Sequence, residues 1–300
     1  MIAVANMKGG VGKTATVVSL AEALAAHNKK VLVIDLDSQA SASFSLAGDE
    51  ELSQLIDKEK TVEDYMLANL SRSQKALKKF IRSSVSNVYH LNKTLDLSLV
   101  PSSIQLRYLE REIVYELTNA GFSMSAIEGR TLTMLQRDLK NLREDYDFIL
   151  FDCAPGISAF TEVAIRLSDL VIVPTIPDRL STLGLPAFCN SVWRSPRNKF
   201  NKMPVPSRPP WVLFTIVRST VKAHQETMTN LREEASSKNS AFKTFDTTVP
   251  QSAAIPKALA LHPGNETTAY PTYASKWGGL DSMLDTLVSE VKGELNGSRR

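Results

Sequence analysis

The stretch from Met1 to Thr16 constrains this chain more than any other, because a short apolar run there meets a glycine-rich turn and a Gly-Lys-Thr triplet. Ile2 to Ala5 are long enough for one buried strand, and a helical pattern begins directly after the turn. A strand, a glycine-rich turn and a helix in this order predict a phosphate-binding loop. The glycines let backbone N–H groups curl around phosphate oxygens at the positive end of the helix. The alternative, a plain turn between a strand and a helix, does not account for the Gly-Lys-Thr triplet.

The polar groups of this loop have expected tasks. We expect Lys13 to reach the β- and γ-phosphates and the Thr14 hydroxyl to contact Mg²⁺. The predicted nucleotide-binding residues of the loop are Lys8, Gly9, Gly10, Val11, Gly12, Lys13, Thr14 and Ala15.

The loop departs from the usual pattern at its start. Met7 stands where the first glycine is expected, and a second lysine, Lys8, precedes Gly9. Such a lysine has no clear task within its own subunit, but it could reach the phosphates of a partner subunit as an arginine finger does. The motif resembles that of the deviant-Walker-A ATPases, the class that contains the ParA partition proteins and MinD. The resemblance implies that Lys8 is catalytic, together with Lys13, and contacts nucleotide across a sandwich homodimer.

Two carboxylates follow the second expected strand, residues 31–34. Asp35 and Asp37 would lie at the ligand-binding edge of an α/β sheet, although capping of the next helix is an alternative for Asp37. The segment 35–43 resembles the DLDPQGNAT stretch of ParA-like proteins. This resemblance implies that Asp37 helps to position the attacking water and that Asp35 lies near the Mg²⁺ shell. The sequence differs from that stretch at Ser38, Ala40 and Ser41.

A further carboxylate ends the apolar run 148–151. Asp152 is expected to be the Walker B residue, which holds Mg²⁺ through water, with a helix cap as the alternative. Short matches to ParA around residues 152–184 and 250 imply that three more residues border the nucleotide. These residues are Pro177, Asp178 and Pro250.

Strands alternating with helical patterns predict an α/β fold with a doubly wound, mostly parallel sheet flanked by helices, as in P-loop NTPases. We expect one ParA-like ATPase domain over residues 1–300, with a helical insertion at 49–90 and a basic, proline-rich loop at 194–210. In the helix expected from Ser103 to Thr118, the inward side chains are predicted to be Ile104, Tyr108, Ile113 and Leu117.

Composition favours a protein of the cytoplasm. No apolar run reaches the ~18 residues of a membrane span, no signal peptide precedes the first strand, and two cysteines provide no disulfide framework. Net charge is +3, but residues 191–300 hold 15 Lys/Arg against 9 Asp/Glu, which favours a polyanion-binding surface. The final helix, 279–295, is acidic, which argues against stable binding to an anionic membrane.

Resemblance to ParA adds a DNA surface. A matching strand in ParA proteins is followed by an arginine in a DNA-contacting position, here Arg218. The further candidate DNA-binding residues are Lys222, Lys243 and Lys257.

These resemblances imply an ATP- and Mg²⁺-dependent partition ATPase. Its ATP-bound homodimer would bind DNA without sequence preference, associate with the nucleoid, and be released when a cargo-bound ParB-like partner stimulates hydrolysis. One alternative is the same cycle acting on a protein or organelle cargo, and another is a MinD-like membrane-associated ATPase. A nitrogenase-reductase-like electron carrier would need paired cysteines, and Cys153 and Cys189 are poorly placed for that role.

Overall fold

The computed structural model describes residues 1–70, 75–86, 88–119, 121, 123–194, 206, 208–253, 255, 268–269 and 280–297. Within these residues, seven strands form one sheet in the order β5-β2-β6-β1-β7-β8-β9. They are β1 (Ile2–Val4), β2 (Val31–Leu36), β5 (Leu97–Val100), β6 (Phe148–Cys153), β7 (Leu170–Thr175), β8 (Trp211–Val217) and β9 (Lys243–Pro250). Every pairing in this sheet is parallel, which confirms the predicted fold class. A small second sheet joins β10 (Thr268–Ala269), β3 (Val88–His90) and β4 (Lys93–Thr94).

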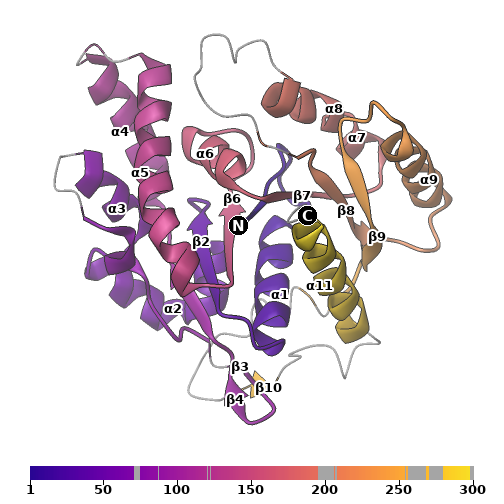
Figure 1. The fold of residues 1–300 in the computed structure, drawn as a ribbon, viewed down its shortest axis with the longest axis horizontal. Coiled ribbons are helices and arrows are strands. Elements are labelled where there is room, and N and C mark those ends of the chain that lie inside the picture. Colours follow the sequence, from indigo (N-terminus) through magenta and orange to yellow (C-terminus); the bar gives the residue numbers. More distant parts are fainter. Residues whose placement is uncertain are drawn as a thin grey trace.

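Helices cover both faces of the large sheet (Figure 1). One face packs against α1 (Lys13–Ala26), α2 (Ser41–Asp57) and α11 (Leu280–Asn296). The other face packs against α3 (Val62–Leu70), α4 (Gln105–Asn119), α5 (Met124–Asp145), α6 (Ala159–Leu167), α8 (Leu185–Cys189) and α9 (Lys222–Ser236). A short helix α7 (Arg179–Thr182) precedes α8, and a π-helical turn, Asn190–Arg194, follows it.

The continuous apolar runs of the strands follow from this three-layer arrangement. In β2, Leu32 and Ile34 belong to one apolar core, whereas Val31 and Val33 belong to the other. Successive side chains of a strand point to opposite faces, so a strand with helices on both sides needs apolar residues at every position. Polar residues are therefore found where the strands end, and that edge carries the site.

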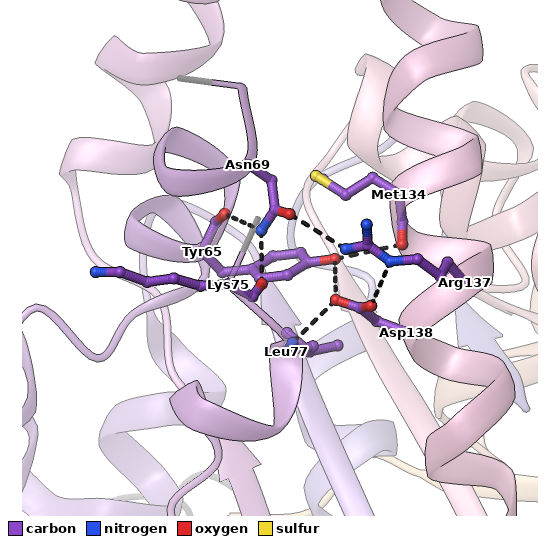
Figure 2. A network of polar contacts seen from close by, with 7 residues as sticks. All are labelled: Tyr65, Asn69, Lys75, Leu77, Met134, Arg137 and Asp138. Carbon is purple, nitrogen blue, oxygen red and sulfur yellow. Dashed lines mark hydrogen bonds and ion pairs between the residues drawn. The ribbon is translucent and has the colours of Figure 1, made fainter. Parts of the chain in front are cut away.

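The segment 49–90, predicted to be a helical insertion, forms much of the connection from β2 to β5. It contains the end of α2, all of α3, the 3₁₀ turn Leu77–Phe80 and β3. Figure 2 shows how α3 is joined to α5: the Tyr65 hydroxyl donates to Asp138 Oδ2 at 3.0 Å, and Leu77 N donates to the same oxygen at 2.9 Å. The segment is thus part of the main core and mixes helix with strand.

The expected inward face of α4 is wrong at the two positions that the structure describes. Ile104 and Tyr108 are 56% and 58% exposed, whereas Leu106 and Leu109 are buried. Both pairs have helical spacing, so periodicity alone does not decide which pair faces α3 and α5. The side chains of Ile113 and Leu117 lie outside the described residues.

Two further expectations concern the surface. Of the predicted basic loop at 194–210, residues 195–205 and 207 lie outside the described residues, and Arg208 donates to the Glu294 carbonyl at 2.7 Å. Among the described helices, none combines the length and the apolar character needed to cross a membrane.

Candidate functional site

The glycine-rich loop between β1 and α1 has the backbone shape that a phosphate-binding loop requires. Gly10 and Gly12 have φ values of +73° and +85°, in the left-handed region that favours glycine, and Gly12 directly precedes α1. Two contacts from other strands hold the loop: Thr215 Oγ1 donates to the Val11 carbonyl at 2.8 Å, and Asn6 Nδ2 donates to the Pro174 carbonyl at 2.7 Å. The loop is therefore preformed at the edge of the sheet.

Lys13, the predicted phosphate-binding lysine, begins α1 and is 6% exposed. Its Nζ donates to the Lys8 carbonyl at 3.0 Å, so the loop contacts its own lysine. Burial lowers the pKa of Lys13, while the nearby Asp152 and Asp37 act to raise it. A phosphate group would supply the negative charge that this buried ammonium group lacks.

Asp35 and Asp152 stand side by side at the ends of β2 and β6, where they are partners in register. Asp35 is completely hydrogen-bonded: Oδ1 accepts from Asp37 N at 3.0 Å, and Oδ2 accepts from Ser43 N at 2.9 Å and Ser43 Oγ at 2.7 Å. Burial raises the pKa of Asp35 to about 6, although these hydrogen bonds oppose the shift. The structure therefore uses Asp35, predicted as a metal residue, to hold the loop that follows it.

Asp152 has the opposite environment. It is fully buried, and neither of its carboxylate oxygens has a hydrogen bond of normal geometry among the described residues. Burial and the neighbouring Asp35 raise the pKa of Asp152 well above its usual range, while the nearby Thr14 hydroxyl and Lys13 act to lower it. A bare carboxylate beside a hydroxyl fits Mg²⁺, which takes one or two protein oxygens and completes its shell with water and phosphate.

A cavity of about 850 Å³ opens beside the loop. Its lining includes most of the predicted nucleotide-binding residues: Gly9, Gly10, Gly12, Lys13, Thr14, Ala15, Asp37 and Pro250. Apolar side chains of α11, Met283, Leu284 and Leu287, line it further from the loop. The cavity thus has a polar, phosphate-binding part and an apolar part that suits a flat base.

Pro177 and Asp178, predicted to border the nucleotide, lie outside the cavity lining. Asp178 instead caps α7, where its Oδ1 accepts from Ser181 N at 2.8 Å and its Oδ2 accepts from Ser181 Oγ at 2.6 Å. Lys8 Nζ donates to Ser181 Oγ at 2.7 Å. Although partial burial acts to raise it, these hydrogen bonds and the charge of Lys8 hold the pKa of Asp178 below its usual value. Lys8 therefore has a partner within its own subunit, contrary to the expectation from the sequence.

The candidate DNA-binding residues do not form one surface. Arg218 follows β8 and donates to Gln251 Oε1, and Lys222 begins α9, 3.6 Å from Glu226 Oε1. Lys243 begins β9 and pairs in register with Trp211 at the start of β8. It therefore lies at the opposite edge of the sheet from Arg218, a strand length of roughly 20 Å away. Lys257 lies outside the described residues.

Some side chains around the site were not expected from the sequence. They are Ser181, Thr215, Gln251, Ser43 and Ser102. Of these, Ser43 had a signal, since it follows the strand-end carboxylates within the recognised stretch 35–43. The others act through neighbours far along the chain.

The parallel sheet, the preformed loop and the bare Asp152 define a P-loop nucleotide-binding protein. The family model described as an AAA domain matches residues 1–203. The chain belongs to this family and is a ParA-type P-loop ATPase.

Similar sequences support the same assignment. The sporulation initiation inhibitor protein Soj of Bacillus subtilis is 29% identical over 192 residues, which cover 64% of each chain. Plasmid partition protein A of Escherichia coli is 31% identical over 183 residues, 59% of this chain and 42% of that protein. The match thus spans less than two thirds of the length of these relatives.

Solved structures share the fold. A putative plasmid partition protein of Borrelia burgdorferi bound to AMPPNP has a TM-score of 0.61 at 20% identity, with 96% of this chain and 98% of that chain covered. An ATP complex of a McdA variant from Cyanothece has a TM-score of 0.63 at 18% identity, with 97% and 95% covered.

Proposed function

We propose that this protein binds ATP with Mg²⁺ in the cavity beside the glycine-rich loop and hydrolyses it to ADP and phosphate. The observation that carries the proposal is the bare, buried Asp152 carboxylate next to Thr14 and Lys13. Magnesium, when bound, would offset negative charge on the phosphates. The relatives solved with AMPPNP or ATP support the choice of nucleotide.

The residues of the chain divide the work. Lys13 would exchange its contact with the Lys8 carbonyl for a phosphate oxygen, and the loop N–H groups would bind the others. Asp37 lines the cavity and would orient the attacking water. Thr14 and Asp152 would hold the metal, while Asp35 shapes the loop that carries Asp37.

Lys8 is proposed to act across a homodimer. Its side chain is held by Ser181 in the single subunit, and large exposed apolar side chains stand on the same two segments. They are Met7, Leu180 and Leu183, with exposures of 49%, 76% and 67%. Apolar side chains exposed this far are suited to burial against another protein surface. In the dimer Lys8 would leave Ser181 and reach the nucleotide of the partner subunit.

The ATP-bound dimer is proposed to bind DNA without sequence preference, near Arg218 and Lys222, and to associate with the nucleoid. A ParB-like, cargo-bound partner would stimulate hydrolysis and release it. The relatives named for plasmid partition and sporulation support this cycle. Because partner choice selects the cargo, positioning of a protein or organelle cargo is the second candidate, and the McdA neighbour favours keeping it.

Two other readings fit the structure less well. In α11 the apolar stripe, including Leu284, Leu287 and Val291, is buried in the core and is not free to enter a membrane. Cys153 and Cys189 are both buried, so they do not provide exposed thiolates for a shared iron–sulfur cluster.

ATP hydrolysis with and without Mg²⁺ tests the proposal directly. Lys13→Ala is expected to lose ATP binding or turnover, because the phosphates lose their buried cation. The matched control is Lys58→Ala, which removes an exposed lysine at the end of α2 and should leave turnover unchanged. Equal turnover in the two variants would contradict the proposed site.

A further inference from the structure

We propose that the buried hydroxyls of Ser43 and Ser102 are positioning groups that hold the backbone at Asp37, and thereby set the rate of hydrolysis. This inference rests on the proposed function, in which Asp37 orients the attacking water. Ser102 lies two residues past the end of β5, the strand next to β2, and Ser43 lies in the first turn of α2. Neither residue touches the nucleotide cavity lining.

The hydrogen bonds form a continuous path from one aspartate to the other. Ser43 Oγ donates to Asp35 Oδ2 at 2.7 Å and accepts from Ser102 N at 2.9 Å. Ser102 Oγ then donates to the Asp37 carbonyl at 2.9 Å. Asp35 Oδ1 closes the path by accepting from Asp37 N at 3.0 Å. Both main-chain polar groups of Asp37 are therefore held by this set of side chains.

The two serines are buried deeply enough for these bonds to matter. Ser43 and Ser102 are both 0% exposed. A hydroxyl without water must make its hydrogen bonds within the protein, and here the bonds go to the loop that carries Asp37. Ser102 Oγ has a second, longer approach of 3.5 Å to the Ser103 carbonyl, so its short bond is the one to Asp37.

The loop needs such support because its backbone is strained. Ala40 has φ +52° and ψ +30°, a left-handed conformation in which an alanine is disfavoured. The Asp37 carbonyl accepts from Ala40 N at 2.8 Å as well as from Ser102 Oγ. Without the serine, one donor from within the strained turn would hold this carbonyl, and the Asp37 side chain would lose its fixed position in the cavity.

The consequence concerns turnover more than nucleotide binding. A small displacement of a group that orients a reactant lowers the rate strongly, whereas the phosphate contacts come from the separate loop at residues 8–15. We therefore expect Ser102→Ala to lower kcat about tenfold and to change the affinity for a non-hydrolysable ATP analogue less than about twofold.

The experiment compares Ser102→Ala with Ser102→Thr and with Ser98→Ala. Thr keeps the hydroxyl and should restore most of kcat. Ser98 is a buried serine on β5 with no hydrogen bond to the Asp37 loop among the described contacts, so Ser98→Ala is the matched control for loss of a buried hydroxyl. Ser43→Ala probes the other end of the path and should also lower kcat, which keeps the test decisive if Thr is too large at position 102.

Hydrogen exchange of the amides of residues 37–40 gives a readout that does not depend on activity. These amides should exchange faster in Ser102→Ala than in the wild type and in Ser98→Ala. Unchanged kcat and unchanged exchange in Ser102→Ala would overturn the inference, as would an equal loss of kcat in Ser98→Ala. A wild type without ATPase activity would instead contradict the proposed function, and the exchange rates would still decide whether the serines hold the loop.

Discussion

Asp35 and Asp152 are register partners on adjacent strands, yet one carboxylate is completely hydrogen-bonded and the other is bare. Asp35 accepts from Asp37 N, Ser43 N and Ser43 Oγ, whereas neither oxygen of Asp152 has a partner among the described residues. This asymmetry separates two roles at one edge of the sheet. Asp35 shapes the loop, and Asp152 is available to a cation.

Asp152→Asn is predicted to stabilise the metal-free protein and to abolish Mg²⁺-dependent hydrolysis. Removing a buried, uncompensated charge should raise the free energy of unfolding by about 1–3 kcal/mol, because the neutral amide costs less to bury. Thermal unfolding in EDTA measures the first effect, and ATP turnover measures the second. Asp35→Asn is the matched comparison and should destabilise the protein, because two N–H groups then lose a charged acceptor. A lower stability of Asp152→Asn than of the wild type would contradict this assignment.

Glu22 predicts a pH-dependent stability that is independent of the site. It is buried in α1, no described residue donates a hydrogen bond to it, and burial raises its pKa to about 7. Between its ordinary pKa of 4.5 and about 7 the folded state binds more protons than the unfolded state, so stability falls as pH rises. Above this range the cost is about 3 kcal/mol.

Glu22→Gln should therefore stabilise the protein at pH 8 and have little effect at pH 4.5. Chemical unfolding at the two values measures the difference. Glu50→Gln, at an exposed position on α2, is the control and should show no such pH dependence. A gain that is equal at both pH values would show that Glu22 is not charged in the folded state.

Ser181→Ala is predicted to favour the ATP-bound dimer. It removes the acceptor of Lys8 Nζ, so Lys8 no longer gives up a hydrogen bond when it moves to the partner's nucleotide. A hydrogen bond of this kind corresponds to about a 3- to 10-fold change in the dimer dissociation constant. Analytical ultracentrifugation with a non-hydrolysable analogue measures it.

Lys8→Ala has the opposite expected effect, with loss of both hydrolysis and ATP-dependent dimerisation. Ser191→Ala, a serine whose Oγ donates to the Phe188 carbonyl, controls for loss of a hydroxyl nearby. Normal turnover in Lys8→Ala would exclude the sandwich dimer.

Asp138→Ala is predicted to destabilise the fold without a direct effect on the site. Asp138 accepts from the Tyr65 hydroxyl, Leu77 N and Arg137 Nε, as Figure 2 shows. Its loss leaves buried donors without acceptors, at a cost of about 2–4 kcal/mol. Chemical unfolding measures the loss, and Arg143→Ala, which breaks an ion pair of exposed groups with Asp169, should cost less than about 1 kcal/mol. Equal losses in both variants would contradict the role given to the network.

The strand ends and the phosphate loop could be predicted from the sequence because their signals are local. Gly12, Lys13 and Thr14 are adjacent, and the carboxyl ends of parallel strands bring Asp35 and Asp152 together whatever the rest of the chain does. The different bonding of these two aspartates could not be predicted, since it depends on where α2 places Ser43.

Contacts between distant residues account for the other differences. Lys8 and Ser181 are 173 positions apart, and no local pattern links them. Likewise, Lys243 and Arg218 were grouped by charge, but the parallel pairing of β8 with β9 places them at opposite edges. On α4, two apolar stripes have helical spacing, and packing against α3 and α5 selects the one with Leu106 and Leu109.

The central claim, that ATP switches this protein onto DNA, is tested most directly by retention of a random-sequence duplex with ATP, ADP or no nucleotide at two salt concentrations. Binding is predicted with ATP alone and should weaken steeply with salt, because phosphate contacts release counterions. Arg218→Ala should weaken it further, whereas Lys243→Ala, at the other edge of the sheet, should not. Equal or absent retention in all three nucleotide states would contradict the claim and leave an ATPase that acts on another partner.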